Sequence, residues 1–176
     1  MAVSIEVIRQ LRDLTAASVS DCKKALDDAQ GDLKQAQELL KKRGLEIAAK
    51  KASRSANQGR IEAYVHTGSR IGVLLEVNCE TDFVARNEDF TRMTRDLAMQ
   101  IAAADPRFVR PEDVPQEETK ELDEKAKKEY LKANVLLCQS FIRDEKMTVQ
   151  DLVTQAIAKL GENIVVRRFV RFKVGE

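Results

Sequence analysis

The sequence predicts an α+β fold, in which three short helices precede a small antiparallel sheet with helices packed on one face and a projecting charged helix. Three observations predict it. Apolar residues recur at helical spacing through the first 44 residues, and after Gly59 the apolar period changes to two. Near the C-terminus, the β-branched and aromatic run IVVRRFVRFKV (164–174) is typical of a further strand.

Capping residues delimit the three helices. Side chains suited to an N-cap precede each of them: Ser4, Ser18 with Asp21 in the form of a capping box, and Asp32. Gly31 and Gly44 are expected to end the second and third helices. Because three such helices bury little surface, we predict that residues 1–44 form a separate domain that presents a surface to a partner.

A change in composition separates this domain from the rest of the chain. Residues 45–58, LEIAAKKASRSANQ, are basic, rich in small residues and poor in large apolar ones. This composition indicates a solvated, partly helical linker. Residues 59–176 then form the α+β core domain.

The core begins with a hairpin. RIEAYVH (60–66) sets Ile61, Ala63 and Val65 against polar neighbours, TGSR supplies a turn, and IGVLLEVN (71–78) resumes the alternation. Further on, Asn87 begins a helix that Asp105-Pro106 closes.

The rest of the core is predicted from charge and capping. Residues 111–134 are dominated by charge and predict a projecting helix with one weakly buried stripe; disorder is the alternative. Thr148-x-x-Asp151 caps another helix, which Gly161 ends. The terminal run joins the hairpin as a third antiparallel strand.

Composition argues against several classes of function. Lys+Arg is 30 and Asp+Glu 29, so the net charge is +1, whereas nucleic-acid binders usually show a basic excess. Arginines interleaved with phenylalanines in VVRRFVRF could still stack on nucleic acid, and this stays an alternative. No apolar run reaches the roughly 20 residues of a membrane span. The three scattered cysteines favour reduced thiols in a cytoplasmic protein.

Groups for catalysis or metal binding are hard to find. His66 is the sole histidine, and neither of the common glycine-rich nucleotide loops is present. Scattered cysteines supply no local zinc-ligand pair. We therefore expect no enzyme, no cofactor and no metal.

One segment has no explanation in a self-contained fold. Within NCETDFVARNEDF (78–90), the string TDFV places Phe83 beside Asp82, between a predicted strand and a predicted helix. Side chains at such a tip usually project outward, so a large apolar group there is expected to be exposed.

Three stretches together resemble bacterial elongation factor Ts, in its short form. They are LRDLTAASVSDCKKALDDAQGDLKQAQELLKKRG (11–44), VNCETDFVARNEDF (77–90) and GENIVVRRFVRFKVGE (161–176). The resemblance implies a ubiquitin-associated-like N-terminal domain. It also implies guanine-nucleotide exchange on the GTPase elongation factor Tu, which is bound in its GDP-loaded and nucleotide-free forms.

The resemblance also implies roles for particular residues. Thr81, Asp82, Phe83 and Val84 would approach the partner's nucleotide site, dislodge Mg²⁺ and release GDP. Longer members have two related core halves, whereas one is visible here. The resemblance therefore implies a homodimer formed by residues 59–176.

The N-terminal domain departs from the family's pattern. Family members commonly have TGAGMMDCKKAL where this chain has TAASVSDCKKAL (15–26). Ala16 and Ser18 replace glycines, and Val19 and Ser20 replace methionines that contact the partner together with the residue matching Arg12. Arg12, Val19 and Ser20 are thus the implied second contact.

Overall fold

The structure of the protein is a computed structural model that describes residues 3–15 and 17–176. Ala16 lies outside the described residues. The fold is α+β, as the sequence predicts, and the chain divides into two compact units. One comprises Met1–Arg54 with Thr154–Asn163, and the other Ser55–Val153 with Ile164–Glu176.

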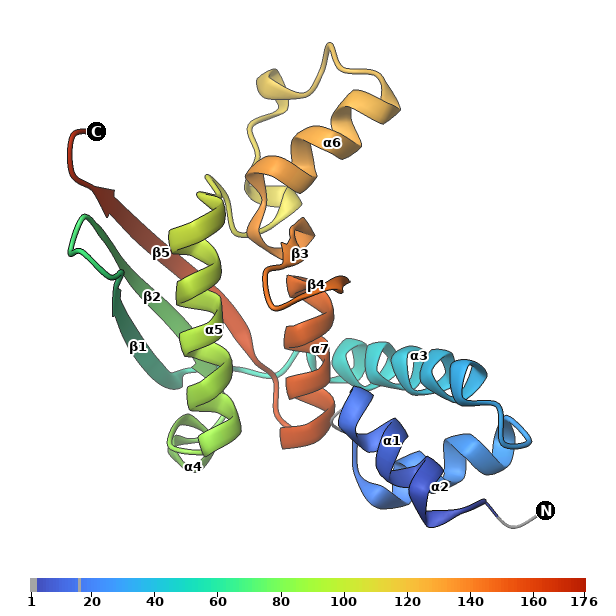
Figure 1. Cartoon of the computed structure of the whole chain (residues 1–176). Helices are drawn as coiled ribbons and strands as arrows, with labels where there is room; N and C mark the ends of the chain where they lie inside the picture. The colour runs from blue at the N-terminus through green and yellow to red at the C-terminus, as the bar shows by residue number, and fades with distance from the viewer. Residues whose placement is uncertain (1–2, 16) are drawn as a thin grey trace. The chain divides into compact units, whose positions relative to one another are not determined.

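The first unit contains the three predicted N-terminal helices, which are α1 (Ile5–Thr15), α2 (Val19–Asp28) and α3 (Leu33–Lys51) (Figure 1). Small and aliphatic side chains form their common core: Leu11, Cys22, Ala25, Leu26, Ala29 and Ala36. The predicted caps are confirmed. Ser18 Oγ accepts from the Asp21 amide at 3.1 Å, and Asp32 Oδ1 accepts from the Lys34 amide at 2.8 Å. Gly31 follows α2 with φ +88°.

The predicted end of the third helix is wrong, because α3 continues through Gly44 to Lys51. A helical glycine costs about 1 kcal/mol relative to alanine, so the continuation needs compensating contacts. The later half of α7 (Val149–Leu160) supplies them. A β-carbon at Gly44 would lie 3.5 Å from Thr154 Cγ2, and Lys51 Nζ donates to Gly161 O at 2.5 Å. Much of the predicted linker is therefore ordered helix, while the predicted domain boundaries stay a prediction.

The second unit is built on a three-stranded antiparallel sheet in the order β1-β2-β5. Its strands are β1 (Gln58–Val65), β2 (Ile71–Cys79) and β5 (Val165–Lys173). Both the hairpin and the third antiparallel strand are thus confirmed. Leu74 lies opposite Ala63 on one side and Val170 on the other, which places these three side chains on the same face.

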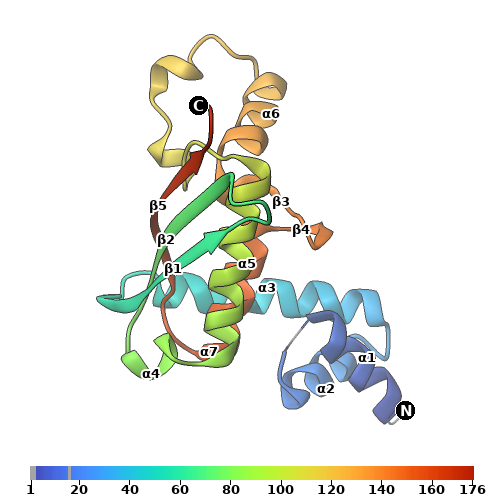
Figure 2. The ribbon, with the colours of Figure 1, turned by 60° about the vertical axis from the view of Figure 1, so that its left-hand side comes forward.

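Helix α5 (Glu88–Ala104) covers the inner face of this sheet (Figures 1 and 2). The inner side chains of the central strand β2 are Val73, Leu75, Val77 and Cys79, all buried. Those of α5 are Phe90, Met93, Leu97 and Ile101, also buried. The outer face carries no helix from the described part of this unit, and its apolar side chains are exposed.

A charged arm leaves the sheet after α5 (yellow to orange in Figure 1). It contains the 3-10 turns η1 (Pro111–Asp113) and η2 (Gln116–Glu118), and then α6 (Glu124–Asn134). The predicted projecting helix is present only over the second half of residues 111–134, because 3-10 turns and irregular backbone precede α6, and none of the side chains of α6 is fully buried. Arg107 donates to Glu118 at 2.6 and 3.1 Å, and the Tyr130 hydroxyl also donates to Glu118. The Tyr130 and Arg107 bonds hold the pKa of Glu118 below its usual value.

A buried amide network anchors the base of the arm. After α6 come η3 (Leu136–Cys138) and the short strands β3 (Ser140–Phe141) and β4 (Asp144–Thr148), a pair that the sequence did not predict. Gln100 of α5 donates to Gln139 Oε1 at 3.1 Å and accepts from the Ile142 amide at 2.9 Å. Because both glutamines are buried, these bonds satisfy groups that would otherwise be costly to bury. Helix α7 then follows with its predicted capping box, in which Thr148 and Asp151 exchange hydrogen bonds.

The arrangement around the end of α3 predicts where a protease cuts first. Lys50 and Lys51 belong to α3 and β1 begins at Gln58, so residues 52–57 are the irregular backbone between them. A broad-specificity protease under native conditions is expected to cleave first within 52–57, because cleavage requires locally extended chain. Mass spectrometry of the early fragments measures this. Early cleavage inside Ile71–Val77 would contradict it.

Candidate partner-binding tip

The segment that the sequence singles out forms a short helix, α4 (Asp82–Ala85), between β2 and α5. Thr81 is its N-cap: its hydroxyl accepts from the Val84 amide at 3.4 Å and its carbonyl from the Ala85 amide at 3.2 Å. The buried thiol of Cys79 donates to the same carbonyl at 3.1 Å. Asn87 then caps α5 by accepting from the Asp89 amide at 2.8 Å. The tip is therefore held by hydrogen bonds at both ends.

Phe83 projects from this tip with 80% of its surface exposed. It has the highest exposure of the large apolar side chains among the described residues. Phe90, seven residues further along, is fully buried beneath the sheet. Since the capped turn directs Phe83 away from that core, its apolar surface is available to another molecule.

Asp82 lies beside Phe83 and forms an ion pair. Arg86 Nη2 lies 2.8 Å from Asp82 Oδ2, one helical turn away, and the side chains of Asp82 and Arg86 are 46% and 78% exposed. Arg86 is not among the residues predicted from the sequence, although its spacing of four residues from Asp82 is the signal for such a pair.

The second predicted contact lies in the other compact unit. Arg12 is on α1, and Val19 and Ser20 begin α2. All three are exposed, Val19 by 55% of its surface. Each predicted contact is thus available on the surface of its own unit.

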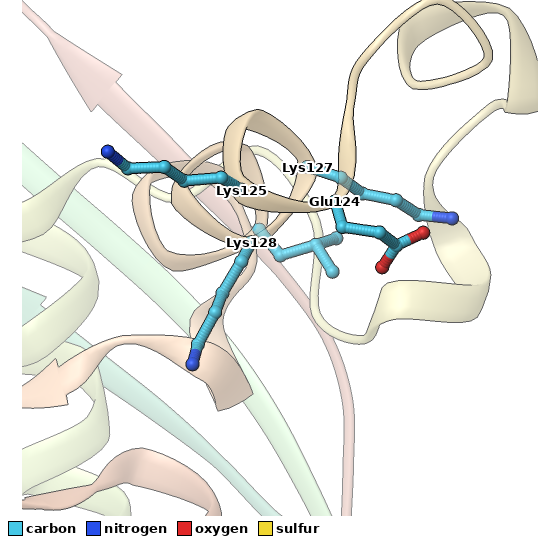
Figure 3. A pocket seen from close by; sticks show the side chains of 5 residues that line it. Glu124, Lys125, Lys127 and Lys128 are labelled. Carbon is cyan, nitrogen blue, oxygen red and sulfur yellow. The ribbon is translucent and has the colours of Figure 1, made fainter.

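A hollow in the described part of the chain lies on α6 and not at the tip. It measures about 550 Å³ and is lined by Glu124, Lys125, Lys127, Lys128 and Leu131. Figure 3 shows that Lys125, Lys127 and Lys128 point in different directions. Because their ammonium groups do not converge, this hollow is a poor site for an anion.

The remaining candidates for chemistry are dispersed. In residues 3–15 and 17–176, no group of three or more His, Cys, Asp or Glu side chains could hold a metal ion. His66 lies at the exposed end of the hairpin, with Nδ1 3.0 Å from the Tyr64 hydroxyl. Burial raises the pKa of the Cys22 and Cys138 thiols, which keeps both protonated near neutral pH.

The arginines of β5 make intramolecular contacts. Arg168 pairs with Glu76 at 2.7 Å. Arg171 is largely buried, pairs with Asp105 at 3.3 Å and donates to Ala102 O at the end of α5 at 3.4 Å. Two of the three arginines in VVRRFVRF thus have partners within the chain, which weakens the nucleic-acid alternative. None of the described helices is long and apolar enough to cross a membrane.

Fold and tip together define the class: an α+β protein that carries a small helical N-terminal unit and an exposed aromatic tip on its sheet unit. The sequence profile described as Elongation factor TS matches residues 3–133. The chain is 49% identical to "Elongation factor Ts" of Carboxydothermus hydrogenoformans, over 99% of this chain and 90% of that protein. It is 48% identical to the protein of that name from Caldanaerobacter subterraneus subsp. tengcongensis, over 99% and 98%. The chain belongs to the elongation factor Ts family and is a translation elongation factor.

The contrast between Phe83 and Phe90 predicts a difference in stability. Phe83→Ala is expected to leave the melting temperature almost unchanged, because the side chain is already in solvent. Phe90→Ala, the matched control, removes a fully buried ring and should cost about 3–5 kcal/mol. Thermal unfolding of both variants measures this. If Phe83→Ala unfolds as readily as Phe90→Ala, Phe83 is a core residue.

Proposed function

We propose that the protein is the guanine-nucleotide exchange factor of elongation factor Tu, and that its tip dislodges Mg²⁺ from the partner and releases GDP. The observation that carries the proposal is the exposure of Phe83 on a turn capped at both ends. The names of the relatives, "Elongation factor Ts", support the same role.

Phe83 acts as the anchor of the contact. Aromatic side chains concentrate binding energy when a pocket on a partner desolvates them. Because the capped turn fixes the backbone before binding, little conformational entropy is lost when the ring docks. Thr81 positions the turn through its cap, and Val84 extends the apolar contact.

Exchange follows from differential affinity. A ligand shifts an equilibrium only by the difference between its affinities for the two states. The protein must therefore bind nucleotide-free elongation factor Tu more tightly than the Mg²⁺–GDP form. When Asp82 and Phe83 displace the cation, the phosphates of GDP lose their largest positive partner and the nucleotide leaves faster. The protein acts by binding alone, without bond chemistry, and does so in the cytoplasm.

The N-terminal unit makes a second contact through Arg12, Val19 and Ser20. The exposed Val19 supports an apolar contribution. Ser20 is small and polar, so this contact is weaker than the one with a methionine at that position. The tip consequently carries more of the affinity in this chain.

The protein forms a homodimer through the outer face of its sheet. Five exposed apolar side chains extend over its three strands: Ile61, Val65, Leu74, Val170 and Phe172. Glu76, on the same face, is paired with Arg168, so it adds no unbalanced charge. A face of this kind in a soluble chain needs an apolar partner surface, and a second copy supplies an identical one about a two-fold axis.

Asp82 and Phe83 are expected to contribute to exchange at different steps. Asp82→Ala is expected to slow stimulated GDP release from elongation factor Tu in excess Mg²⁺, with a defect that shrinks when Mg²⁺ is chelated and need not be displaced. Phe83→Ala should weaken partner binding by about 2 kcal/mol or more, roughly 30-fold. Release of a fluorescent GDP analogue, with and without chelator, measures both. A defect of Asp82→Ala that persists unchanged in chelator would exclude a role in Mg²⁺ displacement.

The outer face of the sheet is expected to hold two copies of the chain together. At micromolar concentration the protein is expected to sediment at about twice the chain mass of 19.8 kDa. Leu74→Lys should produce monomers with an unchanged circular dichroism spectrum, because it places a charge in the middle of the outer face. Leu45→Lys on α3 is a control with matching exposure, 47% against 48% for Leu74, and should remain dimeric. Sedimentation equilibrium that finds only 19.8 kDa species for the unmodified protein would refute the homodimer.

A further inference from the structure

The segment around the tip carries a strong imbalance of charge. Residues 80–89, ETDFVARNED, contain four carboxylates, Glu80, Asp82, Glu88 and Asp89, and a single cation, Arg86. Carboxylates that approach the phosphates of GDP are repelled by them, and a neighbouring cation reduces that repulsion. Arg86, as the single cation of this segment, is therefore the residue that can offset its negative charge when the tip approaches the nucleotide of the partner.

Arg86 is committed to one of these carboxylates. Its guanidinium lies 2.8 Å from Asp82, the acid next to Phe83. Arg86 is also the last residue of the capped turn, and its backbone amide donates to Asp82 O at 3.2 Å. The pair is thus set by local backbone geometry on the same short helix that carries Phe83.

The pair contributes little to the stability of the fold. Both side chains are exposed, at 46% and 78%, and exposed pairs four residues apart add very little to stability. The presence of Arg86 in this segment is therefore poorly explained by a contribution to the stability of the fold.

We propose that the Asp82–Arg86 pair, and not Asp82 alone, is the polar element that the tip presents to the Mg²⁺–diphosphate site of the partner. Arg86 is a positioning residue: it holds the Asp82 carboxylate beside Phe83 and neutralises it while the tip approaches the phosphates. The inference rests on the proposed exchange function. Arg86 then matters for encounter with the GDP-loaded partner and much less for binding the nucleotide-free one, which has no phosphates to repel the tip.

The test compares Arg86→Met with Arg86→Lys, alone and in the Asp82→Ala background. Arg86→Met keeps the aliphatic stem and removes the charge, and it should lower stimulated GDP release by roughly 3- to 10-fold, an effect typical of an exposed charge that governs association. Arg86→Lys should restore most of the rate. In the Asp82→Ala background, Arg86→Met should cause no further loss, because the two residues act as one unit. Arg95→Met, which removes an exposed arginine of α5, is the matched control and should behave as the unmodified protein.

Two further readouts separate positioning from a structural role. The melting temperature of Arg86→Met should match that of the unmodified protein, and its affinity for nucleotide-free elongation factor Tu should change less than twofold. A lowered melting temperature of Arg86→Met would overturn the inference. So would a loss of stimulated GDP release on Arg86→Met that is equally large with Asp82 present and with Asp82→Ala. If the unmodified protein does not stimulate GDP release, the exchange function itself fails. If it does and Arg86→Met is equally active, only the role of Arg86 fails.

Discussion

The packing of α5 on the inner face of β2 is the constraint on which the rest of the sheet unit depends. Phe90, Leu97 and Ile101 on one side meet Val73, Leu75 and Val77 on the other, and all six are buried. Each such side chain stabilises the fold by about 1.5–3 kcal/mol. This layer fixes where β2 ends and where α5 begins. The few residues between them must turn outside the core, so Phe83 is exposed as a consequence of the packing beside it.

The same helix organises the distant parts of this unit. Gln100 ties α5 to the base of the charged arm through Gln139, and Arg171 of β5 donates to a carbonyl at the C-terminal end of α5. A change in the packing of α5 would thus be felt at the tip, the arm and the terminal strand together. The tip can present a fixed anchor because the helix next to it is packed along the sheet by many buried side chains.

Features set by neighbouring residues could be predicted from the sequence. The caps at Ser18, Asp32 and Thr148 follow from short-range hydrogen bonding, and so does the left-handed Gly31. The hairpin follows from the alternation of apolar and polar residues. The helix after Asn87 and the exposure of Phe83 follow from the point where that alternation stops. In each case the physical cause lies within a few residues of the effect.

Features set by distant contacts could not be predicted. Helix α3 passes through Gly44 because Thr154, 110 residues away, packs beside it. Alternation in β1 predicted two faces. It did not predict that the apolar face, which carries Ile61 and Val65, is the outer one, on the side of the sheet away from α5. The pairing of Arg171 with Asp105 likewise depends on the register of β5. The role of the tip came from the resemblance to a family, since no physical rule assigns a partner to an exposed phenylalanine.

The central claim is that the protein drives exchange by preferring one state of its partner. Isothermal titration of the protein into nucleotide-free elongation factor Tu, and separately into its Mg²⁺–GDP form, tests this most directly. The account predicts much tighter binding to the nucleotide-free form, by at least about tenfold, or 1.4 kcal/mol. Equal affinities for the two forms would contradict it, because a ligand without differential affinity cannot shift the equilibrium toward GDP release.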